Sequence, residues 1–454
     1  MFIYNDSDSD FENKSESAVC SYPYLSQGDT NKASLHVDII TTKSGFDQLE
    51  PCWNHLWEQT DCFIFQTFDW NRTWWDHFGE FGQLQIFALY DAEKLVGIAP
   101  LFYDSYSVLG WKTHLSLRLI GSRVYKTDEG PLLGDKAYSD YLQFIIHEEY
   151  TQTFLNYFVE YLKASQFDDL ILEEVPERSS TLDIQNQNLA AHGFITRVSS
   201  ASSTPYINPA ENWEAYLETL DVKQRYNVRR SLKNIVDNKY RLFYLETLGC
   251  DENIEPRRNR FIRMHQQQWN NLGLPGTFAE KCMIGFFKDI TDKVHKKGML
   301  RIYTLYHKND VNLEQCLGID VMIACRSRMY GLHRAVDSGS PYYKKGPGKS
   351  LLVATIQEAI QTSCTFDFLR GVESYKLRLT SGVNENKTIV ISCARRNKNP
   401  LTDIISFVRR IERLLIIERR KKRIIARQNT YYSTSTGYLK ILFNRIKNRI
   451  DKKR

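Results

Sequence analysis

The chain has 454 residues, 42% of them hydrophobic and 25% charged, which is the composition of a folded protein large enough for two or three domains. No segment reaches the ~18 apolar residues of a membrane-spanning helix, and the N-terminus lacks the basic and then apolar pattern of a signal peptide. The net charge of +6 is uneven: residues 401–454 hold 16 Lys and Arg against 4 Asp and Glu, so they carry +12 and the other 400 residues carry −6.

Nine cysteines are scattered along the chain, and none forms a Cys-x-x-Cys pair or shares a short loop with two His. This pattern favours reduced thiols in a cytoplasmic protein over a disulfide framework or a zinc site. We therefore expect no metal. A lone reactive thiol is the alternative to buried, inert cysteines.

Residues 1–36 are rich in Ser, Asp, Asn and Glu and predict a disordered lead. A first domain is expected over 37–200. "FQTFDWNRTWWDHFGE" predicts a helix after an N-cap at Thr67, and Gln83–Tyr90 with Leu95–Tyr103 predict a hairpin around the turn "DAEK". The further elements expected are strands over Leu115–Gly121 and Leu170–Glu173, with a helix over Tyr150–Ala164 between them.

"SSASSTP" (Ser199–Pro205) predicts a linker, and the element order then restarts in a second domain over 205–400. The elements expected there are helices over Trp213–Leu220, Lys223–Asp237 and Glu255–Asn271, a strand near Tyr240–Glu246, three strands within Leu300–Asp337, a helix from about Lys349 and a strand over Thr365–Gly371. Both halves thus contain helix, antiparallel strands, helix and strand.

"SPYYKKGPGKSLLVATIQEAI" (Ser340–Ile360) places a basic Gly turn before a helix. It is not a Walker A loop, because the first Gly of that motif is replaced by Tyr343. A helix start still binds phosphate or pyrophosphate through its free N–H groups and dipole. The alternative is a plain turn with solvated lysines. The residues predicted to bind the donor are Lys345, Gly346, Gly348, Lys349 and Ser350.

Five motifs extend the pattern: "FQTFDWNRTWW", "VGIAPLF", "KQRYNVRRSLKN", "FIRMHQQQWNNLGLPGTF" and "FDFLRGVESYKLRLTSG". Over about Val37–Arg396, in order and at similar spacing, the chain resembles the CelD-like GNAT acyltransferases associated with cellulose and exopolysaccharide synthesis. These are similar in turn to the FemABX peptidyltransferases, which consist of two GNAT-like domains. The last motif is the most specific, because it matches the FemABX Asp-Phe strand, Gly and aromatic-Lys pair at Asp367, Phe368, Gly371, Tyr375 and Lys376.

"FDFLRGVESYKLRLTSG" also places several reactive side chains at the end of a strand, where open α/β sheets bind ligands. For acyl transfer, Lys376 is the candidate to stabilise an oxyanion, Tyr375 to protonate the leaving thiolate and Glu373 to orient or deprotonate the acceptor. His333, on a predicted strand, is a candidate general base. The alternatives are a solvated loop of ordinary ion pairs and a satisfied, partly buried His.

Asp367 and Arg370 are predicted to bind substrate, as are Arg225 and Arg229, which lie four residues apart on the basic helix. A solvated helix face is the alternative for the last two. The tail over 401–454 repeats apolar pairs among basic residues and predicts an amphipathic helix that lies on an anionic membrane, docks on a partner or packs on the body.

The resemblance implies an α/β protein of two GNAT-like domains with mixed, mainly antiparallel sheets and a basic helical tail. It implies transfer of an acyl or acetyl group from acyl-CoA to an amine or hydroxyl acceptor, such as a glycan of a surface polysaccharide, in the cytoplasm or at the inner membrane face. One alternative is aminoacyl transfer from tRNA to a cell-wall precursor. In that case tRNA is the only nucleic acid that we expect the protein to bind. Another is a non-catalytic scaffold of a membrane synthase.

Overall fold

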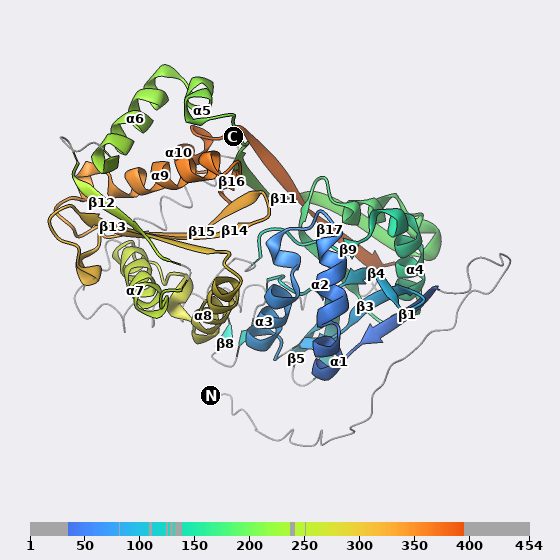
Figure 1. The fold of residues 1–454 in the computed structure, drawn as a ribbon. Coiled ribbons are helices and arrows are strands. Elements are labelled where there is room, and N and C mark those ends of the chain that lie inside the picture. The colour runs from blue at the N-terminus through green and yellow to red at the C-terminus, as the bar shows by residue number, and fades with distance from the viewer. Residues whose placement is uncertain are drawn as a thin grey trace, which may run out of the picture.

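The computed structural model describes residues 35–80, 82–108, 111–123, 126–127, 130–131, 139–236, 241–249 and 251–394. The predicted tail over 401–454, and the predicted lead except its last two residues, lie outside the described residues. The described part forms two α/β units side by side (Figure 1). Within those residues, no helix is both long and apolar enough to cross a bilayer.

The first unit contains most of the strands of the N-terminal half and four α-helices. Its main strands are β1 (Leu35–Ile40), β2 (Gly82–Leu84), β3 (Ile86–Asp91), β4 (Lys94–Ala99), β5 (Leu101–Val108), β6 (Trp111–Leu119) and β10 (Asp169–Pro176), with the short β7 (Lys126–Thr127), β8 (Gly130–Pro131) and β9 (Ile145–Ile146). Its helices are α1 (Lys43–Gln48), α2 (Glu50–Glu58), α3 (Phe68–Phe78) and α4 (Thr151–Ala164).

The predicted hairpin is present as β3 and β4, which pair antiparallel from Phe87↔Ala99 to Asp91↔Lys94. Each predicted strand is divided, however, because β2 and β5 belong to a different sheet from β3 and β4. The divisions fall at Gln85 and at Pro100, which has no N–H to donate to a strand ladder. The hairpin therefore bends from one sheet into the other.

The second unit repeats this order. Its elements are α5 (Trp213–Thr219), α6 (Val222–Val236), β12 (Phe243–Thr247), α7 (Glu255–Asn271), α8 (Lys281–Lys296), β13 (Leu300–His307), β14 (Gly318–Cys325), β15 (Arg328–Val336), α9 (Pro347–Gln361), β16 (Thr365–Asp367), α10 (Ser374–Leu377) and β17 (Gly382–Cys393). In each unit a helix follows the antiparallel strands and leads to a strand that pairs parallel with the last main strand before the helix. These parallel pairs are β6–β10 and β15–β16.

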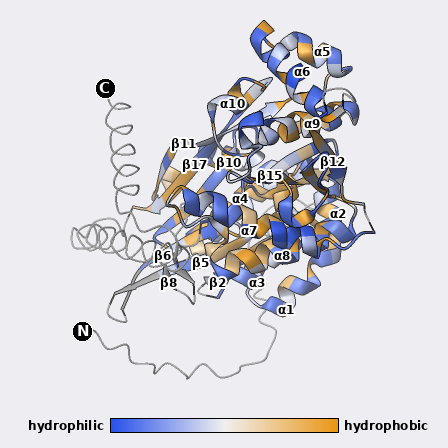
Figure 2. Cartoon of the chain, turned by 90° about the vertical axis from the view of Figure 1, so that its left-hand side faces the viewer, coloured by the Kyte–Doolittle hydropathy of each residue, from blue (hydrophilic) through white to orange (hydrophobic). Residues whose placement is uncertain are grey.

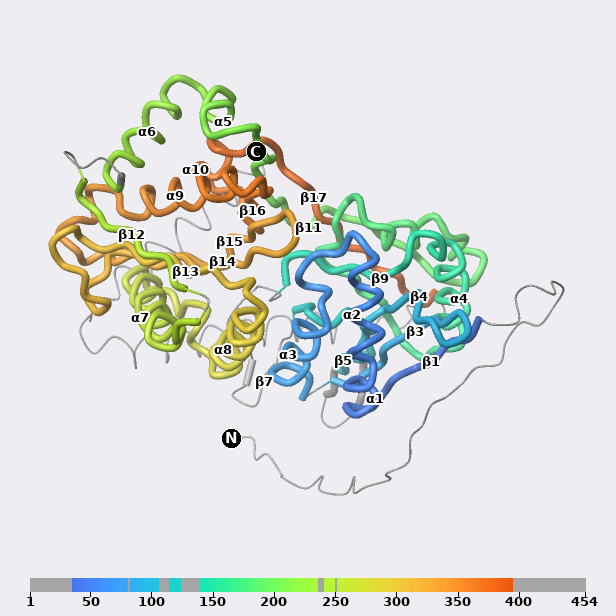
Figure 3. The backbone as a smooth tube through the Cα atoms, in the orientation of Figure 1, coloured from blue at the N-terminus to red at the C-terminus, as the bar shows by residue number. Residues whose placement is uncertain are grey.

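One sheet of eleven strands joins the units, in the order β12-β13-β14-β15-β16-β11-β17-β10-β6-β5-β2. The predicted linker Ser199–Pro205 is wrong, because it lies inside β11 (Phe194–Ile207). β11 pairs along its length with β17, which in turn pairs with β10 of the first unit (Figure 3). The pairing partner comes nearly 190 residues later, so the Ser-rich composition of this segment did not reveal a strand.

Helices cover both faces of the joined sheet. α7 and α8 bury Phe261, Phe286 and Ile290 on one face of the second unit, and this cluster continues into α3 through the ring contact of Trp70 with Phe286. α5, α6 and α9 cover the other face with their own apolar cluster. In Figure 2 the ribbon of α8 carries both hydrophilic and hydrophobic colours, as expected of a helix with one face on the core. The two units therefore share both a sheet and a core.

An ion pair on β6 and β10 gives a stability prediction with a defined pH window. His114 Nε2 lies 2.9 Å from Asp169 Oδ2. Hydrogen bonding to Asp169 raises the pKa of His114 against the effect of burial. Burial raises the pKa of Asp169, but hydrogen bonds from His114 and Ser392 outweigh it and lower the pKa overall.

The pair should stabilise the fold fully between the ordinary pKa values of 3.8 for Asp and 6.5 for His. Its contribution should be lost below that window as pH falls through the folded pKa of Asp169, and above it as pH rises through the folded pKa of His114. We expect His114→Asn to cost about 1 kcal/mol of unfolding free energy at pH 5.5 and less at pH 9. Urea unfolding across this range checks this. A cost independent of pH would assign the loss to packing.

Candidate functional site

The parallel strands β15 and β16 pair over only three registers, Arg328↔Thr365, Met329↔Phe366 and Tyr330↔Asp367. Beyond them β16 ends, while β15 continues to Val336 through a bulge relative to β14. The second half of β15 therefore lies next to the loop after β16 instead of a strand. Among the described residues no strand pairs with that side of β15, so its backbone groups there are open to other hydrogen-bond partners.

The turn after β15 ends in a left-handed Gly346 (φ 78°), which is followed by Pro347 as the first residue of α9. A Cβ on Gly348 would lie 2.8 Å from Val336 Cγ2, so only Gly lets α9 approach β15 this closely. The N–H groups of Lys349 and Ser350 both donate to the Gly346 carbonyl. Ser350 is buried and its hydroxyl donates to Ser231 O at 3.0 Å, which ties α9 to α6.

Three exposed cations, Lys349, Arg230 and Arg378, lie near one another at the start of α9. Burial lowers the pKa of Lys349, and the charges of Arg230 and Arg378 lower it further. These residues come from α9, from α6 and from the segment after α10, and together with the dipole of α9 they attract an anion. Lys345 is also exposed on the turn. Sequence analysis missed Arg230 and Arg378, although both lie within the quoted motifs.

α10 carries the reactive side chains predicted from "FDFLRGVESYKLRLTSG". Lys376 is buried, and its ammonium lies 3.2 Å from Phe368 O, 2.9 Å from Arg370 O and 3.1 Å from Glu373 Oε2. An ammonium has three N–H donors, so all three are used within the protein. Its role with an oxyanion stays a prediction, and that role would require one of these bonds to break.

Tyr375, in contrast, is 48% exposed. Burial raises the pKa of its phenol, the charge of Arg334 opposes this, and the charges of Glu373 and Asp320 add to it. Arg334 donates to the buried Asp320 from Nε at 3.1 Å. Tyr375 therefore remains protonated at neutral pH, near β14 and β15.

His333 lies on the other face of β15. It pairs with Val321, and its ring centroid is 5.5 Å from that of Phe278 and 5.6 Å from that of Phe287, on the side of α7 and α8. The neighbouring Arg334 faces the opposite way, towards Asp320 and Tyr375. The structure thus separates His333 from the α10 residues by the thickness of the sheet.

Asp367 lies at the junction of the two units and is fully buried. Its carboxylate accepts from Tyr141 Oη at 2.8 Å, from the Leu369 N–H at 2.8 Å and from Arg328 Nη1 at 3.0 Å. Burial raises the pKa of this carboxyl, while the charge of Arg328 and the other donors oppose that rise. The side chain is committed to bonds within the protein.

Arg370 extends the same junction. Its Nε donates to Asp140 Oδ1 at 2.6 Å and its Nη1 to Glu174 Oε1 at 3.3 Å. Both carboxylates belong to the first unit. Substrate binding by Asp367 and Arg370 stays a prediction, but in this structure they connect the β16 loop to the first unit.

The two predicted arginines of α6 contact α5. Arg225 donates to the carbonyl oxygens of Leu217, Glu218 and Leu220 at the end of α5. Arg229 pairs with Glu214 at 2.6 Å, and both side chains are more than half exposed. Among the arginines of α6, Arg230 is the one whose charge acts on Lys349 at the start of α9. It lies on a different face of α6 from Arg225 and Arg229.

One family model matches the part of the chain that contains these features. Residues 222–377 match the family model described as "Acetyltransferase (GNAT) domain", about a third of the chain. This segment runs from α6 to α10 and so contains the start of α9, the divergence of β15 from β16 and Tyr375. No curated protein matches the chain significantly.

Solved structures resemble the chain over both units. The crystal structure of FemX matches with a TM-score of 0.51 and 12% identity, covering 77% of this chain and 96% of FemX. The C-terminal domain of a putative lysylphosphatidylglycerol synthetase from Agrobacterium fabrum matches with a TM-score of 0.45 and 9% identity, covering 80% and 95% of the two chains. A tandem GNAT protein from the clavulanic acid biosynthesis pathway matches with a TM-score of 0.39 and 10% identity, covering 78% and 98%.

The predicted fold class is confirmed for the described residues, and the predicted helical tail lies outside them. The protein is an α/β protein with two GNAT-like domains and mixed sheets, and its second unit contains a GNAT acetyltransferase domain.

Proposed function

We propose that the second domain transfers an acyl group from acyl-CoA to an amine or hydroxyl acceptor. The observation that carries this is the gathering of Lys349, Arg230 and Arg378 at the start of α9, beside the point where β15 leaves β16. A pyrophosphate at the helix start would meet three cations and the positive end of the helix dipole. The pantetheine chain would then lie along the unpaired edge of β15, with the thioester towards α10.

Tyr375 is the proposed acid. The acceptor attacks the thioester carbonyl, the carbon–sulfur bond breaks, and the departing thiolate takes the phenolic proton. The phenol of Tyr375 is protonated at neutral pH and is half exposed, so it can meet the departing thiolate. Glu373, next to it and 55% exposed, is the proposed group that orients or deprotonates the acceptor, and Lys376 holds the loop that carries both.

The first domain differs at the corresponding place, which supports a single donor site. β6 and β10 also pair over three registers, but there Arg118 is 2% exposed and donates to Glu173 at 2.7 Å. The helix between these strands, α4, is preceded by Glu148 and Glu149, which would repel a pyrophosphate. We therefore assign donor binding to the second domain.

Transfer of an aminoacyl group from tRNA is the second candidate, because α6 carries five Lys or Arg and no Asp or Glu. A surface-polysaccharide glycan, as for the CelD-like enzymes, is the acceptor we propose for the first candidate. Incubation of the purified protein with acetyl-CoA and amino or hydroxyl sugars should release free CoA, detected with a thiol reagent. Acceptor-dependent transfer from aminoacyl-tRNA without CoA release would favour the second candidate instead.

A further inference from the structure

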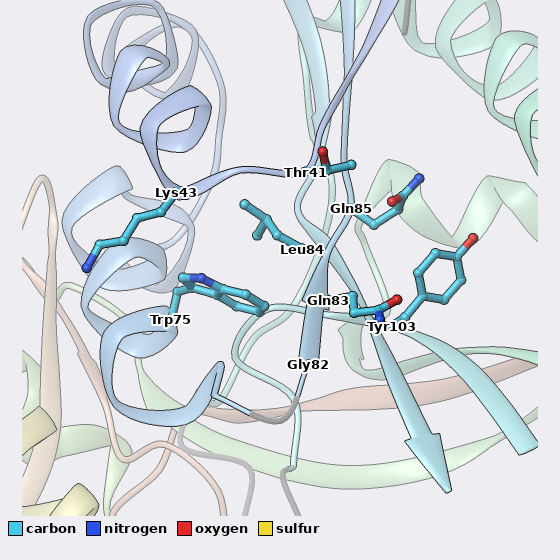
Figure 4. A pocket seen from close by; sticks show the side chains of 8 residues that line it. All are labelled: Thr41, Lys43, Trp75, Gly82, Gln83, Leu84, Gln85 and Tyr103. Atoms are coloured by element: carbon cyan, nitrogen blue, oxygen red, sulfur yellow. The ribbon is translucent and has the colours of Figure 1, made fainter. Parts of the chain in front are cut away.

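A pocket of about 510 Å³ lies in the first domain, beside β2 at the edge of the eleven-stranded sheet (Figure 4). Its volume is within the range of small-molecule sites, about 300–1,000 Å³. It is lined from α1, α3, the end of β1 and the strands β2 and β5. None of its lining residues belongs to the second domain, so this pocket is distinct from the proposed donor site.

Trp75 of α3 supplies a flat apolar surface on one side of the pocket. Gly79 makes room for its ring, because a Cβ there would lie 2.5 Å from Trp75 Cδ2, and the backbone of Gly82 lies within contact distance of the ring. The ring is further supported by Phe102, with centroids 6.0 Å apart. The indole is therefore held in one orientation while remaining partly exposed.

The indole N–H of Trp75 has no acceptor among the residues that the structure describes. In the same domain, the indole N–H groups of Trp53, Trp57 and Trp70 donate, at 2.9, 3.0 and 2.9 Å, to Gln66 O, Phe63 O and Ser139 Oγ. That of Trp74 has no acceptor among the described residues either, but Trp74 is 1% exposed and Trp75 faces the pocket. Trp75 thus offers both a ring face and a donor to a ligand.

The other side of the pocket is polar and carries no carboxylate. Gln83 and Tyr103 stand opposite each other on β2 and β5, and Thr41 and Gln85 lie next to them (Figure 4). The one charged group, Lys43, pairs with Asp76 at 2.8 Å and points away from the other lining side chains. An amide both donates and accepts in one plane, which suits a pair of neighbouring hydroxyl groups.

We propose that this pocket binds a neutral sugar unit of a glycan. A sugar ring has an apolar C–H face to lie against Trp75 and hydroxyl groups at its rim for the two glutamines, Thr41 and the indole N–H. An anionic ligand would find the one lining cation, Lys43, already paired with Asp76, and a purely apolar ligand would leave the Gln83 amide without a partner. The first domain would then hold a glycan while the second carries the chemistry, but this binding does not depend on the proposed acyl transfer.

The test uses the full chain with maltotetraose, laminaritetraose and chitotetraose as separate probes at millimolar concentration. Saturation-transfer NMR should show contact between the protein and at least one of them, and tryptophan fluorescence should titrate with it. Trp75→Leu should weaken that binding about tenfold and Gln83→Ala at least threefold. Gln83 is exposed, so its variant should fold normally even if Trp75→Leu is destabilised.

Gln152→Ala is the matched control, because Gln152 is a surface glutamine on α4 outside the pocket. It should bind as the wild type does. The proposal is overturned if none of the three sugars shows saturation transfer, or if Gln83→Ala binds with unchanged affinity. Neither result bears on CoA binding, which is measured separately.

Discussion

Replacing Arg370 with Met is expected to lower the free energy of unfolding by about 3–5 kcal/mol. Its guanidinium lies between Asp140 and Glu174, whose side chains are both 11% exposed. Burial lowers the pKa of Arg370, and the two carboxylates outweigh that effect and raise it. Without the arginine, two nearly buried carboxylates would face each other with no cation between them. Urea unfolding measures the loss.

The same substitution at an exposed pair is the control. Arg229 pairs with Glu214, and their side chains are 52% and 64% exposed. Arg229→Met should change stability by at most about 1 kcal/mol, because solvent screens such pairs. If the two variants lose equal stability, the junction between the domains does not depend on the Arg370 ion pairs.

Replacing Tyr375 with Phe is expected to lower kcat by about 10²-fold or more, with little change in KM for acyl-CoA. Only the hydroxyl is removed, and the side chain is half exposed, so the fold should be unaffected. Steady-state kinetics with an identified acceptor gives both constants. Tyr226→Phe, at an even more exposed tyrosine on α6, should leave both unchanged.

If kcat of Tyr375→Phe stays within about threefold of the wild type, Tyr375 is not the acid. His333 would then be the next candidate for proton transfer, acting from the opposite face of β15. This outcome would move the acceptor to the side of α7 and α8 and leave the position of the donor unchanged.

Local patterns predicted many of the elements well. The helix expected over Glu255–Asn271 coincides with α7, and the three strands expected within Leu300–Asp337 are β13, β14 and β15. Their apolar spacing and the turns between them are local properties of the sequence. Pairing between distant segments is not a local property of the sequence. The sequence therefore did not indicate that β17 pairs with β10 of the first domain.

The sequence predicted only part of the site, because contacts between distant segments decide the rest. The Gly turn and "FDFLRGVESYKLRLTSG" indicated where to look, and the segment that matches the GNAT domain model contains the turn and the motif as far as Leu377. The partner of each side chain depends on packing: α6 is tied to α9 by the Ser350 hydroxyl, which bonds to Ser231 O, and Arg230 is the α6 arginine whose charge acts on Lys349, while Arg229 pairs with Glu214. Lys376 was predicted to stabilise an oxyanion, a role that stays a prediction, and the carbonyls that its ammonium contacts lie in the preceding loop.

Calorimetric titration of the purified protein with CoA at low salt tests the central claim most directly. We expect one site per chain. The double variant Lys349→Met/Arg230→Gln should weaken binding at least tenfold, about 1.4 kcal/mol, because it removes two of the three cations at the start of α9. Lys223→Met, at an exposed lysine elsewhere on α6, is the control and should bind normally. Absence of binding to the wild type, or equal affinity in the double variant, would contradict the assignment of the donor site.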